Sequence, residues 1–220
     1  MFYNPEDFPW LKTFQNSFEE IKKELEQIKT LPKKPLYENT WGNEDRPTYL
    51  NKEENKNAQW DTFVFKFFNI KHIPNSNSCP KTAALLEQFP QIITAEFSLI
   101  KPNTHILPHT GYSGKYKRAH LGMIIPEGDL GIKVNGETKK WQENKWLIFD
   151  DSQWHEAWNK SNEERVVLMI DFVDNPQNAK TVCKEILTET NDPFIFNTAP
   201  KELWLNWVDK GQFPLNPNDI

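Results

Sequence analysis

The sequence is poor in cysteine and has no long run of apolar residues. Two cysteines among 220 residues are too few for a disulfide framework or a structural zinc site, so we expect two free thiols. No apolar stretch approaches the roughly 20 residues that cross a bilayer. The N-terminal MFYNPEDFPW also lacks the basic start and apolar core of a signal peptide. These absences predict a soluble cytoplasmic protein with no membrane partner.

The chain also has no excess of basic residues. Its formal net charge is −5, and its lysines are interspersed with acidic residues, as in EEIKKELEQIK at residues 19–29. A nucleic-acid binder needs a basic face for phosphates, so we expect no nucleic-acid partner. Aromatic residues are abundant instead, with nine tryptophans and fifteen phenylalanines. These should fill the core and any pocket. The composition does not indicate an oligomeric state.

Short β-type runs dominate the middle of the chain, separated by Gly, Pro, Asn and Asp turn residues. The runs cover residues 59–68, 94–100, 120–126, 131–134, 145–150 and 165–172. Asn135-Gly136 between two of them is a strong hairpin signal. Closely spaced strands with no intervening helices predict a mainly β fold, an antiparallel sandwich or barrel.

Helical patterns flank this β region. Ser17 and Glu20 form a potential capping box in an N-terminal helix whose apolar residues recur at helical spacing. The segments CPKTAALLEQF and NPQNAKTVCKEIL predict two further helices. We therefore expect one domain over residues 1–220. Its predicted parts are an N-terminal helix and irregular arm (1–58), a barrel core (59–173), and a C-terminal helix and tail (174–220) that pack on the barrel.

Four of the five histidines gather in the β region. His105, His109 and His120 lie close together, and His155 follows in QWHE. Imidazole is the commonest side-chain ligand of mid-row transition metals. Two histidines brought together across a small β-barrel would supply two of the three ligands in the facial triad of non-haem Fe(II) oxygenases. On spacing alone, a hydrogen-bonded structural role for each histidine stays open.

Four blocks of this region resemble one family. FSLIKPNTHILPHTG, RAHLGMIIP, LIFDDSQWHEAWN and ERVVLMIDF are similar to the aspartyl/asparaginyl β-hydroxylases, which are iron- and 2-oxoglutarate-dependent oxygenases. The resemblance runs from about Trp60 to Phe172. It implies a double-stranded β-helix, the jelly-roll or cupin-like barrel, with one Fe(II) near its mouth. It also implies 2-oxoglutarate as cosubstrate and O2 as oxidant.

The resemblance assigns roles to individual residues. His109 of PHTG and His155 of QWHE match the two iron-binding histidines, so His105 is expected to lie outside the site. Arg165 matches the arginine that pairs with the distal carboxylate of 2-oxoglutarate, a group that a planar guanidinium binds with two hydrogen bonds. Ser98 matches a serine that supports the same carboxylate. A surface salt bridge is the alternative for Arg165.

Further positions follow from the same blocks. Arg118 and His120 match residues that contact the other end of 2-oxoglutarate. Gly111 lies two residues after His109, where many enzymes of this chemistry carry an acidic ligand, and the family fills that position with water. Asp150 and Asp151 are candidates for the outer acidic residue that steadies such a water. A turn role at the end of a strand is the alternative for both.

The substrate side departs from the family. Tyr116 and Lys117 stand where the large peptide-modifying members carry more arginine, so we expect a free amino acid or a small amino-acid-containing substrate, hydroxylated on an unactivated carbon, the β-carbon. Trp60, Trp154 and Trp158 are candidates for the pocket lining or the core. Three alternatives remain: a peptidyl Asp/Asn β-hydroxylase, a radical halogenase with chloride in the vacant position, and a non-catalytic ligand-binding β-barrel.

Overall fold

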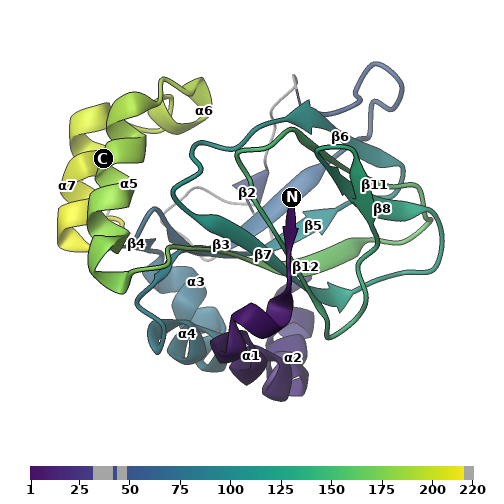
Figure 1. Cartoon of the computed structure of the whole chain (residues 1–220), viewed down its shortest axis with the longest axis horizontal. Coiled ribbons are helices and arrows are strands. Elements are labelled where there is room, and N and C mark those ends of the chain that lie inside the picture. Colours follow the sequence, from purple (N-terminus) through teal and green to yellow (C-terminus); the bar gives the residue numbers. More distant parts are fainter. Residues whose placement is uncertain (32–41, 44–48, 216–220) are drawn as a thin grey trace.

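Two antiparallel sheets packed face to face form the centre of the molecule in the computed structural model, which describes residues 1–31, 42–43 and 49–215 (Figure 1). The larger sheet contains, in spatial order, β1 (Phe2–Tyr3), β10 (Trp146–Phe149), β7 (Lys117–Ile124), β12 (Arg165–Phe172), β5 (Ile92–Ile100), β3 (Trp60–Phe67) and β2 (Gly42–Asn43), and β4 (Ile70–Lys71) pairs with β3. The smaller sheet contains β6 (Thr104–His109), β11 (His155–Asn159), β8 (Leu130–Val134) and β9 (Glu137–Lys139).

The strand order is that of a double-stranded β-helix. Along the chain from β5 to β12, the strands β5, β7, β10 and β12 enter the larger sheet, and β6, β8, β9 and β11 enter the smaller one. Repeated crossing between two facing sheets defines the jelly roll, so the predicted fold class is confirmed. No ladder in the described residues joins the two sheets, which therefore form a sandwich rather than a closed barrel.

Helices cover the outer face of the larger sheet and one end of the sandwich (Figure 1). The helices before β5 are α1 (Lys12–Asn16), α2 (Phe18–Ile28), α3 (Ile73–Ser78) and α4 (Pro80–Glu87), with 3-10 turns at Pro5–Asp7 and Pro9–Leu11. The N-terminal helix was therefore predicted, but the capping box was wrong, because the Ser17 side chain makes no capping hydrogen bond. Most of the predicted arm, residues 31–56, lies outside the described residues.

The C-terminal segment forms a separate helical layer. It contains a 3-10 turn at Pro176–Asn178 and the helices α5 (Ala179–Glu189), α6 (Pro193–Phe196) and α7 (Lys201–Lys210). Trp204 and Trp207 are buried in an apolar cluster with Phe68 and Ile93, so the tail packs on the end of the larger sheet, as predicted. No helix in the described ranges is long and apolar enough to cross a membrane. Both cysteines are free and buried, and burial raises the pKa of each thiol to about 12.

Side-chain alternation along the central strands gives the larger sheet two unlike faces. Side chains on a strand point alternately to opposite faces. On β5, β7 and β12, one set of alternate residues is apolar and packs on the helices. The other set faces the smaller sheet and includes polar and charged side chains. This inner set comprises Thr94, Glu96, Ser98, Arg118, His120, Arg165 and Asp171.

Candidate active site

The candidate site begins with a pair of histidines on adjacent strands. His109, the last residue of β6, is the direct cross-strand partner of His155, the first residue of β11. Their ring centroids are 4.2 Å apart. A register shift follows His155 in this ladder, and such bulges re-aim side chains at strand ends. Two histidines separated by 46 positions in sequence therefore lie side by side at the ends of two adjacent strands of the smaller sheet.

Both rings are held in the same tautomer. The Nδ1 of His109 lies 2.8 Å from the carbonyl oxygen of Leu107, and the Nδ1 of His155 lies 2.9 Å from that of Gln153. A carbonyl only accepts, so each Nδ1 carries the proton and each Nε2 presents a lone pair. Burial lowers the pKa of His109 to about 4 and also lowers that of His155. The pair is neutral at pH 7, the state that a metal ligand requires.

Asp151 provides the buried carboxylate beside this pair. Its Oδ1 lies 3.4 Å from the Nε2 of His155 and 2.8 Å from an Nη of Arg118, and its Oδ2 accepts a 2.7 Å hydrogen bond from Tyr116. Burial favours a neutral carboxyl, but Arg118 and His155 outweigh it, so the pKa of Asp151 is lowered. Asp150 instead accepts bonds from Ser152 in a turn. The two sequence candidates therefore have different environments.

The Asp151 carboxylate lies directly against Gly111. A Cβ built on Gly111 would lie 1.6 Å from the Oδ2 of Asp151. The Gly111 backbone N–H also donates to the Asp151 carbonyl oxygen at 2.8 Å. The carboxylate of residue 151 thus occupies the space that a side chain at position 111 would need. This close approach is a physical reason for glycine at the position.

Arg118 lies between two buried carboxylates. Besides its ion pair with Asp151, it donates from Nε and an Nη to both oxygens of Asp171, at 2.7 and 2.8 Å. Asp171 is its cross-strand partner on β12. The two carboxylates raise the pKa of Arg118 despite its burial. In this structure its donors therefore contact protein carboxylates, and its predicted contact with 2-oxoglutarate stays a prediction.

A cavity of about 30 Å³ lies between the two sheets and contains Arg165. The Arg165 side chain is 1% exposed, donates one hydrogen bond of 2.9 Å to the Ser98 carbonyl oxygen and stacks on Trp141. Its Nε has no hydrogen-bond partner, and no described carboxylate pairs with it. Burial alone lowers its pKa, to about 9. The surface salt bridge considered for Arg165 is therefore absent from the described structure.

The same cavity, called the inner cavity below, contains a second unused donor. The His120 Nδ1 accepts a 3.2 Å hydrogen bond from the Trp141 indole, so its proton is on Nε2, which has no partner among the described residues. The Ser98 hydroxyl accepts from the Trp60 indole at 2.9 Å. No aspartate or glutamate of the described residues lines this cavity. Its buried donors fit a small anion.

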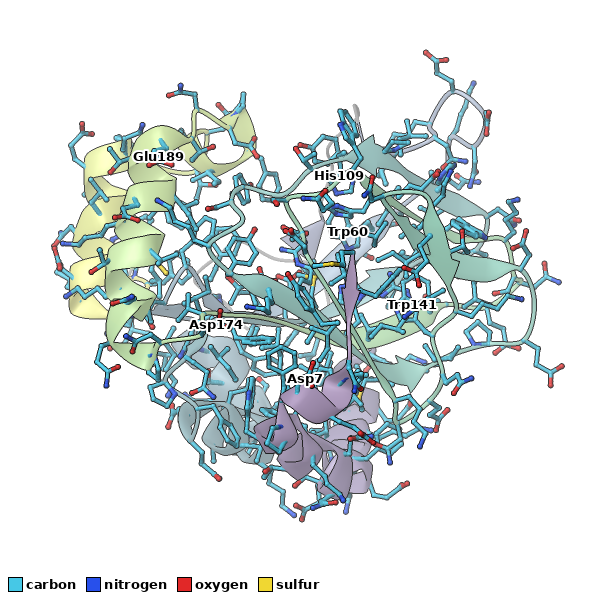
Figure 2. All side chains as sticks on the ribbon, in the orientation of Figure 1. Asp7, Trp60, His109, Trp141, Asp174 and Glu189 are labelled. Atoms are coloured by element: carbon cyan, nitrogen blue, oxygen red, sulfur yellow. The ribbon has the colours of Figure 1, made fainter. Side chains whose placement is uncertain are left out.

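A second cavity of about 60 Å³, called the outer cavity, is also lined by His109. It shares Trp60, His109, Arg118 and Met169 with the inner cavity. Figure 2 shows Trp60 below His109 in this view, between the two sheets. The remaining lining residues of the outer cavity are Tyr49, Phe67, Thr94, Glu96, Thr110, Gly111, Tyr112 and Asp151.

Several candidates from the sequence lie elsewhere. His105 pairs with Glu156 at 2.8 Å, away from both cavities, as expected. Trp154 is 66% exposed, and Trp158 donates to Asp129 at the surface, so neither lines the inner or the outer cavity or fills the core. Asp171, Trp141 and Glu96 were not predicted from the sequence as residues of the site. Asp171 and Glu96 could have been found as charged residues in otherwise apolar strands, at the alternate positions whose side chains face the other sheet.

No group of three or more His, Cys, Asp or Glu side chains in the described part of the chain is arranged to bind a metal. The site therefore offers two neutral imidazoles, with Asp151 nearby. Two imidazoles with open positions suit a mid-row transition metal such as Fe(II). The unpaired buried donors of Arg165 and His120 in the cavity beside them suit a carboxylate ligand such as 2-oxoglutarate. Fold and site together define the class of a double-stranded β-helix protein with a two-histidine centre.

Comparison with known proteins agrees with this class. The family model for aspartyl/asparaginyl beta-hydroxylase matches residues 15–175, and the chain belongs to this family. The match begins well before Trp60, so the resemblance extends over most of the N-terminal helix as well.

Individual relatives cover this chain to different extents. An ornithine lipid ester-linked acyl 2-hydroxylase of Rhizobium tropici is 35% identical over 178 residues, 78% of this chain and 59% of that protein. The human aspartyl/asparaginyl beta-hydroxylase is 37% identical over 131 residues, 56% of this chain and 17% of that protein. The chain thus spans less than two thirds of either relative. A solved 2OG-Fe(II) oxygenase from Burkholderia pseudomallei matches with a TM-score of 0.39 and 10% identity, covering 53% of this chain and 67% of that one.

Proposed function

We propose that this protein is an Fe(II)- and 2-oxoglutarate-dependent hydroxylase of an amino acid or a small amino-acid-containing molecule. The observation that carries the proposal is the juxtaposition of two features. A neutral pair, His109 and His155, presents two Nε2 atoms, and beside it lies a buried Arg165 without a carboxylate partner. A metal fits the first feature and an anion fits the second.

In this proposal His109 and His155 hold the iron through Nε2. Their backbone carbonyl partners keep the rings oriented, which limits the reorganisation needed when the metal binds. Asp151 lies beside His155, and its Oδ1, which pairs with Arg118, could also accept a hydrogen bond from a water molecule held by the iron. Bound iron with 2-oxoglutarate and O2 supplies the oxidising chemistry, which yields succinate, carbon dioxide and a hydroxylated carbon.

The inner cavity is the proposed site of 2-oxoglutarate. Arg165 would bind its distal carboxylate with Nε and the remaining Nη, while Ser98 lines the same end of the cavity. His120 would donate from Nε2 to the other end, near Arg118. An anion that pairs with Arg165 offsets the cost of burying its charge, so the cosubstrate satisfies donors that the protein itself leaves open.

The alternatives differ in their support. A halogenase needs chloride beside position 111, where the Asp151 carboxylate lies. This negatively charged carboxylate repels chloride and can accept a hydrogen bond from water, which favours hydroxylation over halide binding. A non-catalytic barrel needs neither a neutral histidine pair nor an unpaired buried arginine. Peptidyl Asp/Asn hydroxylation rests on the human relative. Hydroxylation of an acyl group on an amino-acid-containing lipid is a second candidate, because the Rhizobium relative carries that name.

The test is a coupled assay of the protein loaded with Fe(II). Amino acids, short peptides and acylated amino acids are supplied with 2-oxoglutarate and O2, and succinate and product mass are measured together. We expect succinate release that requires both iron and 2-oxoglutarate, with one product heavier by one oxygen atom. A chlorinated product in chloride buffer would instead establish the halogenase. Absence of iron binding would support the non-catalytic barrel.

A further inference from the structure

Asp171 is a buried carboxylate to which the proposed function gives no role. It is 2% exposed and lies on the inner face of β12, in the same alternate set of residues as Arg165 and Met169. Arg165 and Met169 line the inner cavity, whereas Asp171 lines neither cavity. A buried charge of this kind needs a partner, so any effect of Asp171 on a bound ligand must pass through that partner.

The partner of Asp171 is Arg118, which lies directly opposite it in the ladder between β7 and β12. The Nε of Arg118 donates to Oδ1 of Asp171 at 2.7 Å, and one Nη donates to Oδ2 at 2.8 Å. A planar guanidinium held by a carboxylate at two points cannot turn without breaking at least one of the two bonds. The register of two central strands therefore fixes the plane of the Arg118 guanidinium.

The rest of the Arg118 guanidinium belongs to the candidate site. Arg118 lines both cavities, and its other Nη lies 2.8 Å from Oδ1 of Asp151. The same Oδ1 is 3.4 Å from Nε2 of His155. A guanidinium has five N–H groups, and the contacts with Asp171 and Asp151 use one on each of its three nitrogens. Each Nη therefore keeps a second N–H that can donate to a ligand.

We propose that Asp171 is a positioning residue for the cosubstrate. It holds the Arg118 guanidinium by one edge, so that the remaining Nη donors meet the end of 2-oxoglutarate that lies away from Arg165. The inference rests on the proposed function and adds to it a residue that does not itself contact the ligand. Without Asp171 the Arg118 side chain would have to be ordered when the cosubstrate binds, and this loss of conformational entropy lowers the affinity.

The first experiment measures the affinity for 2-oxoglutarate without turnover. 2-Oxoglutarate is titrated by calorimetry into the anaerobic protein loaded with Fe(II), for the wild type and for Asp171→Asn. The substitution keeps the shape of the side chain and replaces one acceptor by a donor. It should raise the Kd for 2-oxoglutarate roughly tenfold, as loss of a charge-assisted contact does, while the iron content stays that of the wild type. An unaltered Kd in a folded Asp171→Asn protein would overturn the proposal.

Asp174→Asn is the matched control. Asp174 follows the end of β12 and pairs with Lys117, the neighbour of Arg118 in β7. Figure 2 shows Asp174 away from His109 and Trp60, and Lys117 lines neither cavity. The same substitution should therefore leave the Kd for 2-oxoglutarate at the wild-type value. An equal rise of the Kd in both variants would assign the effect to overall charge, against the proposal.

A double variant separates positioning from a purely structural ion pair. Arg118→Gln combined with Asp171→Asn removes both charges together, which spares the fold the cost of one buried unpaired charge. If the pair is only structural, this double variant should bind 2-oxoglutarate as the wild type does, and that result would contradict the proposal. We expect instead the weakened affinity of Arg118→Gln alone, because Asp171 has no effect on the ligand once the arginine is gone.

The last measurement needs no variant. In a crystal structure of the wild type with Fe(II) and 2-oxoglutarate, grown without O2, both bonds from Arg118 to Asp171 should persist, and an Nη of Arg118 should lie within hydrogen-bond distance of the cosubstrate. An Arg118 that leaves Asp171, or that does not reach the cosubstrate, would refute the inference. A wild type that binds no 2-oxoglutarate in the calorimetry would refute the proposed function and the inference with it, whereas equal binding by the wild type and all variants would refute the inference alone.

Discussion

The two cavities share one wall and differ in electrostatic character. Among the residues placed in the structure, Arg165 and no carboxylate line the inner cavity, whereas Glu96 and Asp151 line the outer cavity. Arg118 borders both, but Asp151 and Asp171 balance its charge. The two cavities lie along the inner face of the larger sheet. On β5, Ser98 lines the inner cavity and Glu96, two residues earlier, lines the outer cavity. In our proposal the inner cavity binds an anion beside Arg165.

The largest effect should come from removing either histidine of the pair that lines the inner cavity. We expect His109→Ala or His155→Ala to reduce bound iron from about one Fe(II) per chain to near zero, and turnover to be lost, because one imidazole alone is too weak a site. His105→Ala, on the outer side of the smaller sheet, should keep both. Metal analysis and succinate release measure the outcome, and full turnover in either of the first two variants would refute the assignment.

Binding of 2-oxoglutarate in the inner cavity should depend on the planar guanidinium group of Arg165. Arg165→Lys keeps the charge and loses the two-point contact, at a cost of roughly 2–4 kcal/mol. The KM for 2-oxoglutarate should therefore rise about 30-fold or more, while the iron content stays near that of the wild type. Steady-state kinetics at varied 2-oxoglutarate is the measurement. An unchanged KM would mean that 2-oxoglutarate binds elsewhere.

A methyl group at position 111 should disturb the outer cavity. In Gly111→Ala the new Cβ would meet the Asp151 carboxylate, which must leave its contacts with Arg118 and Tyr116. We expect a loss of about 2–4 kcal/mol in the free energy of unfolding, as for a broken buried ion pair, and weaker iron binding. Urea unfolding and iron titration are the measurements.

A double variant tests the reason for this effect. Gly111→Asp combined with Asp151→Ala returns one carboxylate to the same space. It should bind iron more tightly than Gly111→Ala does. If Gly111→Ala were as stable as the wild type, the space beside Gly111 would be able to accommodate a side chain, and the structural argument for glycine would be wrong.

The smallest effect should come from the hydrogen bond that holds Asp151. Tyr116→Phe removes the 2.7 Å bond from Tyr116 to Asp151, and we expect a loss of about 1–3 kcal/mol in stability because the acceptor is charged. The KM for 2-oxoglutarate should not change, since Arg165 is untouched. Tyr112→Phe, which removes a 2.8 Å bond to Asp192, is the matched control. Tyr116→Phe should lower iron affinity more than Tyr112→Phe does, because only Tyr116 holds Asp151. If both variants lower iron affinity equally, Tyr116 has no special role in positioning Asp151.

Much of the fold could be predicted from local patterns. Short β-type runs, the Asn135-Gly136 hairpin and the apolar periodicity of α2 depend on neighbouring residues, so they are legible in the sequence. The strand β6 was harder to predict, since Pro102 and Asn103 come directly before it and Pro108 lies within it. Failure of the Ser17 capping box has a local cause, because Ser17 continues from α1 and has φ −98° and ψ 13° rather than the extended conformation of a cap.

The amino-acid sequence by itself determined the family and the two-sheet β fold. It also identified the candidate ligand-binding residues, above all His109, His155 and Arg165. Only the tertiary structure decided which of Asp150 and Asp151 enters the site, that Arg118 pairs with Asp171, and that Glu96 and Arg165 line different cavities. The physical reason is that these relations are set by strand register and by chain crossings between sheets. Strand pairing brings together residues that are tens of positions apart, and local sequence patterns do not predict the distance between their side chains.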